Sequence, residues 1–294
     1  MAGRRPLALA LALCLALAGC GGVAKSPGAD PTTPTLTPAG VPQAADLNGS
    51  RLLAPGLGTD GVFDAGRLAS AHRNRLATTS YRLVHTRTVQ YADASRAAAD
   101  PVDGLDFVHE ESVVAPDRRG YTFTKLETSA REWSAAAPFS RVDIWFHEPL
   151  VRNRFVDAGG TERYWGFDDE PAGGPLVAPS NHERVAAELA VVETTVVGQE
   201  RVDGVAHYRI RGHGLDADGS LPTPPLATDP RNVSLVGTVD ERGVVRSYTL
   251  TYDATFAVDG SRLEVRRVHR LDRVGTASVG RPAWLPTANE SVTG

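Results

Sequence analysis

From Tyr81 onward the sequence is a succession of segments rich in β-branched and aromatic residues, and the links between these segments are short. The first of them, residues 81–91 (YRLVHTRTVQY), predicts a long strand. Turn signals at residues 116–120 (PDRRG) and 202–204 (VDG) separate later segments. Parallel neighbours need crossovers of about a dozen residues or more, which these links are too short to provide. The pattern therefore predicts an antiparallel meander of about ten strands.

Two segments with helical periodicity interrupt the strands. Asp64 is a good N-cap for a helix that runs to about Thr78 and has an apolar stripe that includes Leu68. A second helix is expected after Ser180, because Ser180 and Glu183 have the spacing of a capping box. Helices and strands do not alternate regularly, so the predicted fold class is α+β with the helices on one face of the sheet.

The N-terminus has the order of features that defines a signal peptide. Arg4 and Arg5 supply positive charge, residues 7–17 are an apolar run, and small residues precede Cys20. The apolar run has about a dozen residues, whereas a membrane-spanning helix needs roughly 20. Residues 17–20 (LAGC) resemble the lipobox of prokaryotic lipoproteins, in which the cysteine is lipidated and becomes the mature N-terminus. We therefore predict lipidation of Cys20; the alternative is an ordinary cleaved signal that a cysteine happens to follow.

These features divide the chain into four regions. Residues 1–19 are the predicted signal peptide, exported by the Sec or the twin-arginine route. Residues 20–48 begin with the lipidated cysteine and continue as a flexible stalk rich in Pro and Thr. Residues 49–285 are the predicted single sheet domain, and residues 286–294 are a C-terminal tail.

Cysteine content and charge narrow the classes of function. The sequence has two cysteines, Cys14 and Cys20, so the predicted domain has no thiol or disulfide although it is expected outside the cytoplasm. The formal net charge is −4, and removal of the two N-terminal arginines makes the chain slightly more acidic. A nucleic-acid partner requires a concentrated basic face, so none is expected. Candidate glycosylation sequons begin at Asn48, Asn232 and Asn289.

No catalytic, cofactor or metal signature in the sequence is complete. Residues 216–220 (DADGS) begin like a calcium loop but lack its bidentate glutamate, and the acidic residues 168–170 are expected to form a solvated loop. Three His-Glu pairs lack the second histidine of a zinc-protease helix; they begin at His109, His147 and His182. We therefore expect neither enzymatic activity nor a cofactor or metal site.

Aromatic residues are concentrated between residues 133 and 167, in a chain that is 6% aromatic overall. Core packing is the simplest role for them. The alternative is that they line an apolar ligand cleft, because ligand pockets are concave and mostly apolar. The candidate cleft residues are Trp133, Trp145, Phe146, Phe155, Tyr164, Trp165 and Phe167.

The order of helix, long strand, meander, helix and meander resembles the lipoprotein-carrier fold of LolA and the LppX/LprG group. Residues 197–208 (VGQERVDGVAHY) are similar to a hairpin that recurs in that group. The lipobox, residues 240–246 (DERGVVR) and residues 281–284 (RPAW) also resemble uncharacterised haloarchaeal-type surface lipoproteins. The resemblance implies a strongly curved antiparallel sheet, a half-barrel, wrapped over two or more helices, with acyl chains in the apolar space between them. It supplies no catalytic residues.

Together these observations predict a lipoprotein on the extracytoplasmic face of the cell membrane. It would be tethered through Cys20 and would bind a hydrophobic or amphiphilic ligand, such as a lipid, between sheet and helices. The alternative is a non-catalytic structural or interaction module of the cell envelope with a filled core. An apolar cleft of several hundred Å³ between sheet and helices would favour the first hypothesis, and a filled space the second.

Overall fold

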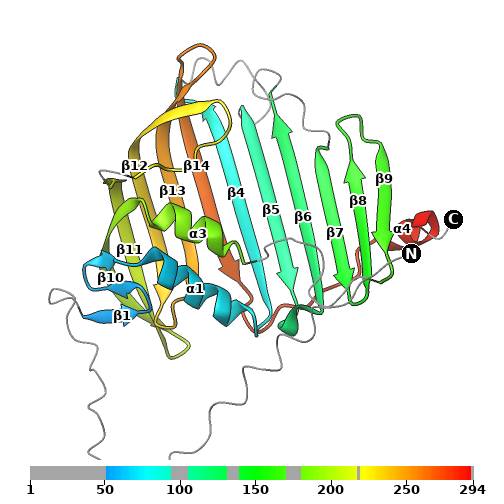
Figure 1. Cartoon of the computed structure of the whole chain (residues 1–294), viewed down its shortest axis with the longest axis horizontal. Helices are drawn as coiled ribbons and strands as arrows, with labels where there is room; N and C mark the ends of the chain where they lie inside the picture. The colour runs from blue at the N-terminus through cyan, green and yellow to red at the C-terminus, as the bar shows by residue number, and fades with distance from the viewer. Residues whose placement is uncertain (1–50, 94–104, 131–138, 170–179, 217–218, 293–294) are drawn as a thin grey trace, which may run out of the picture. The chain divides into compact units, whose positions relative to one another are not determined.

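The computed structural model describes residues 51–93, 105–130, 139–169, 180–216 and 219–292 (Figure 1). The predictions for the signal peptide, the lipid anchor at Cys20, the stalk, Asn48 and Trp133 lie outside the described residues. They therefore remain predictions.

Within these ranges the chain forms fourteen strands, three α-helices and one 3-10 helix. The helices are α1 (Ala65–Leu76), α3 (His182–Leu189) and α4 (Leu285–Val292), with the 3-10 helix η1 at Pro116–Arg118. The strands are β1 (Leu52–Ala54), β2 (Leu57–Gly58), β3 (Gly61–Val62), β4 (Tyr81–Tyr91), β5 (Asp106–Val114), β6 (Gly120–Ser129), β7 (Arg141–His147), β8 (Leu150–Val156), β9 (Glu162–Phe167), β10 (Val192–Val202), β11 (Val205–Leu215), β12 (Ala227–Asp240), β13 (Val245–Phe256) and β14 (Arg262–Asp272).

Eleven of the strands form one antiparallel sheet, in the order β10-β11-β12-β13-β14-β4-β5-β6-β7-β8-β9. Most neighbours are consecutive in the chain, as a meander requires. The exception is the pair β14 and β4, in which Leu263 is opposite Tyr91 and Asp272 is opposite Arg82. This pairing joins two runs of strands into one sheet, while β1, β2 and β3 form a small sheet of their own. The predicted α+β class with a large antiparallel sheet over helices is confirmed.

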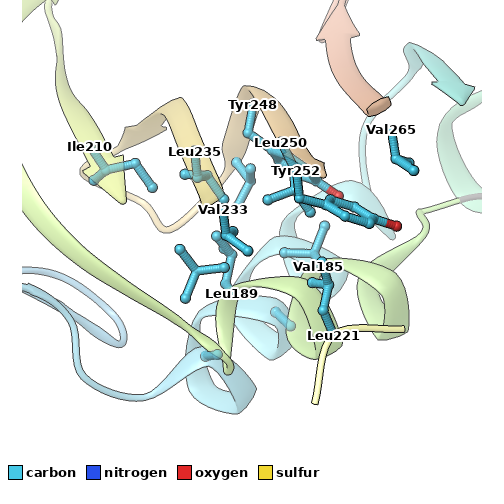
Figure 2. Close-up of a cluster of buried hydrophobic side chains, with 14 of the residues drawn as sticks. Val185, Leu189, Ile210, Leu221, Val233, Leu235, Tyr248, Leu250, Tyr252 and Val265 are labelled. Atoms are coloured by element: carbon cyan, nitrogen blue, oxygen red, sulfur yellow. The ribbon is translucent and has the colours of Figure 1, made fainter. Parts of the chain in front are cut away.

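Helices α1 and α3 lie on one face of the sheet, over the strands β10–β14 (Figure 1). Alternate residues of β13 point toward these helices, and Tyr248, Leu250 and Tyr252 are buried there. Figure 2 shows Val185 and Leu189 of α3 packed with them. Side chains of the helices and strands thus form one apolar core under α1 and α3. We call β10–β14 together with β4 the covered half of the sheet.

The other strands, β5–β9, form what we call the open half. A second core cluster connects Leu76, at the end of α1, with Tyr121, Phe146 and Val151 on β6, β7 and β8. Neither α1 nor α3 extends over β7–β9 (Figure 1). The two halves of one continuous sheet therefore differ in how much helix covers them.

The two predicted helix starts had different outcomes. Asp64 caps α1 as expected, because its Oδ1 accepts a hydrogen bond of 2.8 Å from the backbone N–H of Arg67. The prediction of a capping box at residues 180 and 183 is wrong. Asn181 occupies the N-cap position with φ of 51°, so Ser180 lies one residue too early, and its Oγ is 3.1 Å from Nδ1 of His182 instead.

The C-terminal residues from 286 onward were predicted to be a tail, but most of them belong to α4. This helix contacts β8 and β9. Leu285 and Ala288 are one helical turn apart and are both buried, at 6% and 0% exposure. The folded part of the chain therefore continues beyond residue 285, as far as Val292.

Candidate functional site

The main sheet has two faces, and the strand register assigns each side chain to one of them. Successive side chains on a strand alternate between faces, and directly opposed residues on neighbouring strands share a face. Val151 belongs to the same core cluster as Leu76 of α1, so it lies on the side of α1 and α3, which we call the helix face. Arg152, the next residue, lies on the opposite side, which we call the outer face.

The predicted cleft residues do not form one cluster, because the register divides them between the two faces. Trp145 is opposite Arg152, and Phe146 is opposite Val151, so these adjacent aromatics point in opposite directions. The helix face receives Phe146, Phe155, Trp165 and Phe167, and the outer face receives Trp145 and Tyr164. These residues are close in sequence, but side chains alternate between the two faces along a strand, so neighbouring aromatics lie on different faces.

On the helix face, apolar side chains continue from the buried core to the edge of the sheet. Phe146 is fully buried, and Phe123 and Ile144 are partly buried against the same cluster. Asn153 is opposite both Ile144 and Trp165, which places the indole in the same row. We call the helix-face residues Phe123, Ile144, Phe155, Trp165 and Phe167 the aromatic strip.

The outer end of the aromatic strip is exposed to solvent. Trp165 is 53% exposed and Phe167 is 38% exposed, on the edge strand β9. Their rings meet edge to face, with centroids 4.1 Å apart and planes inclined at 71°. Phe155 makes a second ring contact, with Phe139 at 5.0 Å. Exposed apolar patches that continue from a core mark interaction sites more often than scattered apolar residues do.

The covered half buries a polar cluster between α3 and the sheet, which the sequence did not indicate. Glu188 of α3 is 0% exposed and accepts a hydrogen bond of 2.6 Å from Nη1 of Arg267 on β14. His269, two residues further along β14, stacks on Tyr248 with ring centroids 4.9 Å apart. His72 of α1 lies 5.9 Å from His269, centroid to centroid. These contacts connect both helices to β13 and β14.

The histidines of this cluster are neutral. His72 Nε2 donates to the carbonyl of Ser180 at 3.0 Å, and its Nδ1 accepts from the N–H of Val245 at 3.2 Å, so one ring nitrogen carries a proton. Burial lowers the pKa of His72 to about 4. His85 of β4 is opposite His269 and is also buried. Burial likewise lowers the pKa of His85 to about 2 and that of His269 to about 3. A protonated imidazole would lose hydration here without gaining a carboxylate partner at hydrogen-bond distance.

On the outer face, Arg152 attaches α4 to the sheet. The side chain is 4% exposed, and its guanidinium group makes four hydrogen bonds. Its Nε donates to Oδ1 of Asn289 on α4 at 2.8 Å, and its Nη1 donates to the carbonyls of Val151 and Phe167. Nη2 bonds to Asp168 at 2.6 Å. The acidic stretch predicted to be a solvated loop therefore has a defined ion-pair partner at its first residue.

The other polar motifs singled out in the sequence are separate in the structure. Asn232 is exposed with φ of 54°, and its side-chain amide donates to Asp253. His109 lies on β5, His147 ends β7 and His182 begins α3. Among the described residues, His, Cys, Asp and Glu side chains do not form a group of three or more that could hold a metal ion. Glycosylation at Asn232 and Asn289 stays a prediction, as does the expectation of no cofactor.

Comparison with known proteins identifies structural similarities but no sequence family. No family model and no curated protein matches the sequence. LprF from Mycobacterium bovis aligns over 74% of this chain and 97% of its own, with 10% identity and a TM-score of 0.31. LppX from Mycobacterium tuberculosis covers 72% and 94%, with 11% identity and a TM-score of 0.29. A LolA superfamily protein from Nitrosomonas europaea covers 74% and 95%, with 8% identity and a TM-score of 0.23.

These similarities concern the fold at a distance, and the resemblance to haloarchaeal lipoproteins stays a prediction. In the part of the chain that the structure describes, no helix has the length and apolar character needed to span a membrane.

Proposed function

We propose that this chain is an extracytoplasmic lipoprotein that holds the acyl part of an amphiphilic ligand against the aromatic strip. The observation that carries the proposal is the exposure of Trp165 and Phe167 at the end of an apolar row that begins in the core. An acyl chain lying along this row would gain about 0.8 kcal/mol for each buried methylene. It would also remove the two exposed rings from water.

Charged side chains beside the aromatic strip suit a ligand with a polar head. Directly opposed residues form a row across four strands of the helix face. In this row Phe155 is opposite both Arg163, which is exposed, and Val142, and Val142 is in turn opposite Lys125 of β6. Lys125 itself pairs with Glu127 at 2.5 Å. The row therefore has an apolar centre with Arg163 at one end and the Lys125–Glu127 ion pair at the other, and a ligand with an acyl tail and an anionic head would complement it at Arg163.

The proposed location at the membrane follows from the N-terminal sequence. A signal peptide that ends at Cys20 would place the lipid on the mature N-terminus, and the stalk would hold the domain away from the membrane surface. Substitution of Cys20→Ser in the full chain should release the protein from the membrane fraction. Continued membrane association of this variant, measured by fractionation, would contradict the anchor.

The proposed ligand can be tested by lipid mass spectrometry of the full chain purified in mild detergent. We expect a co-purifying lipid that is depleted in the variants Trp165→Ser and Phe167→Ser. Val236→Ser is the matched control, because Val236 is an equally exposed apolar residue, at 47%, on the outer face of the covered half. Equal lipid content in all four proteins, or no lipid in any, would refute the proposal.

A second candidate function is a structural or interaction module of the envelope without a ligand. The apolar core beneath α1 and α3 favours it, since Val185 and Leu189 pack there against the sheet (Figure 2). Quenching of tryptophan fluorescence by vesicles with brominated acyl chains separates the two. A lipid binder should be quenched, and the quenching should fall in Trp165→Phe, whereas a module with no lipid site should show no dependence on Trp165.

A further inference from the structure

A pocket of about 400 Å³ has its charged residues on the outer face of the open half. Its floor comes from β6, β7 and β8, and its wall is the segment that leads into α4. The lining residues are Thr122, Phe123, Thr124, Arg141, Asp143, Ile144, Arg154, Pro282, Ala283 and Trp284. The volume is in the range of pockets that bind small molecules.

The pocket is built around one carboxylate that holds two guanidinium groups. Asp143 is 3% exposed. Its oxygens accept from Nε and Nη2 of Arg141 at 2.7 and 3.0 Å, and from Nε and Nη2 of Arg154 at 2.9 and 2.7 Å. Thr124 adds a fifth hydrogen bond at 2.8 Å. Burial alone would raise the pKa of Asp143, but these hydrogen bonds outweigh it and hold the pKa below its usual value.

This arrangement leaves guanidinium donors on the floor of the pocket that Asp143 does not use. Two arginines share one aspartate, and each arginine uses only its Nε and Nη2 on that aspartate. Nη1 of Arg154 lies 3.4 Å from Glu162, at the upper limit of a hydrogen bond, and Nη1 of Arg141 has no partner among the described residues. The side chain of Arg141 is 39% exposed, so its remaining donors face solvent.

Trp284 gives the pocket an apolar wall next to these donors. The guanidinium carbon of Arg154 is 5.8 Å from the centroid of the Trp284 ring, and the Tyr164 ring is 6.4 Å away on the neighbouring strand. The indole and the two guanidinium groups are therefore fixed relative to one another before any ligand arrives. Guanidinium groups held in this way match the oxygen geometry of phosphate and carboxylate.

We propose that this pocket binds an oxyanion, a phosphate or carboxylate carried on a small organic group, with the oxyanion at Arg141 and Arg154 and the organic group against Trp284. Glu162 is the competing carboxylate, and the bound oxyanion replaces it at Nη1 of Arg154. The side chains of Asp143 and Arg154 lie on the face of the sheet opposite to the aromatic strip, although Phe123 and Ile144 of that strip also line the pocket. The same chemistry could come from a soluble metabolite or from the headgroup of a lipid.

The test uses calorimetric titration of the full chain with inorganic phosphate, with glycerol phosphate, and with phosphatidylcholine vesicles that do or do not contain phosphatidylglycerol. Arg141→Gln should weaken binding by about tenfold or more, the loss expected for a hydrogen bond between charged groups. Arg262→Gln is the matched control, because Arg262 pairs with Asp253 at 2.6 Å outside the pocket. This control should bind like the unchanged protein.

The arms of the experiment identify the source of the ligand. Saturable binding of glycerol phosphate that depends on Arg141, and is tighter than binding of inorganic phosphate, indicates a soluble ligand. Binding confined to vesicles with phosphatidylglycerol, with the same dependence, indicates a headgroup. The proposal is overturned if no arm shows a difference between Arg141→Gln and Arg262→Gln.

A gain-of-binding variant keeps the test decisive if Arg141→Gln does not fold, as judged by circular dichroism. Glu162→Gln removes the competing carboxylate while Arg141, Asp143 and Arg154 stay in place. It should bind the same probe several-fold more tightly. Unchanged or weaker binding by Glu162→Gln would overturn the proposal independently of the arginine variants.

Discussion

The covered half of the sheet and strands β7 and β8 of the open half bury charges on opposite faces, while Asp106 of β5 is buried on the helix face with Arg87. In the covered half, Glu188 and Arg267 are buried on the helix face, beneath α3. In the open half, Asp143 and Arg152 are buried on the outer face, where α4 and the segment before it lie. The helix face of the open half ends instead in exposed aromatic rings. The polarity of each face therefore follows the element that packs on it, even though the strands are continuous members of one sheet.

This comparison separates residues that stabilise the fold from residues that are available for binding. Polar groups beneath α3 connect two helices to the sheet, so their loss should affect stability. The exposed end of the aromatic strip contributes little packing, so its loss should affect binding and leave stability almost unchanged. The following predictions test that division.

The largest effect is expected from the buried ion pair of the covered half. Glu188→Ala leaves Arg267 buried without its carboxylate, which should lower the free energy of unfolding by about 3–5 kcal/mol. Urea denaturation followed by circular dichroism measures it. Glu183→Ala, on the exposed side of the same helix, is the control and should change stability by less than about 0.5 kcal/mol. Similar values for both variants would show that the ion pair is not what joins α3 to the sheet.

The apolar core of the covered half should give the next largest effect. Leu250 is 0% exposed on β13, in the cluster shown in Figure 2. Leu250→Ala removes buried methyl groups and leaves a cavity, so we expect a loss of about 2–5 kcal/mol in the free energy of unfolding. The same denaturation experiment measures it, and a loss below about 1 kcal/mol would indicate that this core is loosely packed.

The neutral histidines should make the covered half sensitive to mild acid. Their folded-state pKa values are below the unfolded value of about 6.5, so below that pH the unfolded chain binds protons that the folded chain does not. Their stabilising effect is complete above pH 6.5 and is lost as the pH falls toward about 4, where His72 itself titrates. Each histidine should contribute about 1.4 kcal/mol of lost stability per pH unit in that window.

Unfolding free energies measured at several pH values between 5 and 6.5 test this expectation. Because the pKa of Asp143 is held below its usual value, that carboxylate stays ionised across the window. His269→Phe should reduce the slope of stability against pH by the contribution of one histidine. An unchanged slope in this variant would mean that His269 gains its proton in the folded state.

The smallest effect on stability is expected at the exposed end of the aromatic strip. Phe167 is 38% exposed, so Phe167→Ser should change the free energy of unfolding by about 0.5 kcal/mol or less. Lipid content should fall in the same variant if the proposed function is correct. A large loss of stability in Phe167→Ser would assign the ring to the core and would remove the distinction between the two halves.

Local signals in the sequence were sufficient to predict much of the fold. Tight turns and β-branched segments predicted the antiparallel meander, and Asp64 predicted the start of α1. The pairing of β14 with β4 had no local signal, because it depends on contacts between segments far apart in the chain. The helical part of the C-terminus was missed because Leu285 and Ala288 form only a short apolar stripe, and their partners are on β8 and β9.

The candidate sites were predictable in part. The position of Trp145 and Phe146 on opposite faces follows from the period of a strand, and applying that period would have divided the aromatic group correctly. The period of a strand does not predict that Asp143 pairs with two arginines. Arg141 is two residues away on the same strand, but Arg154 reaches Asp143 only through the register of β7 with β8. Such clusters are visible only when the strands are aligned.

The pairing of β14 with β4 also sets the order in which the sheet can be completed. Strand β4 is synthesised before its partner on one side, Arg262–Asp272, and nine strands lie between them in the chain. Until then one edge of β4 has unpaired backbone donors and acceptors, which can pair with other chains. We therefore expect slow folding, typical of sheets closed by distant segments. A chain shortened before residue 262 should aggregate rather than form half a sheet.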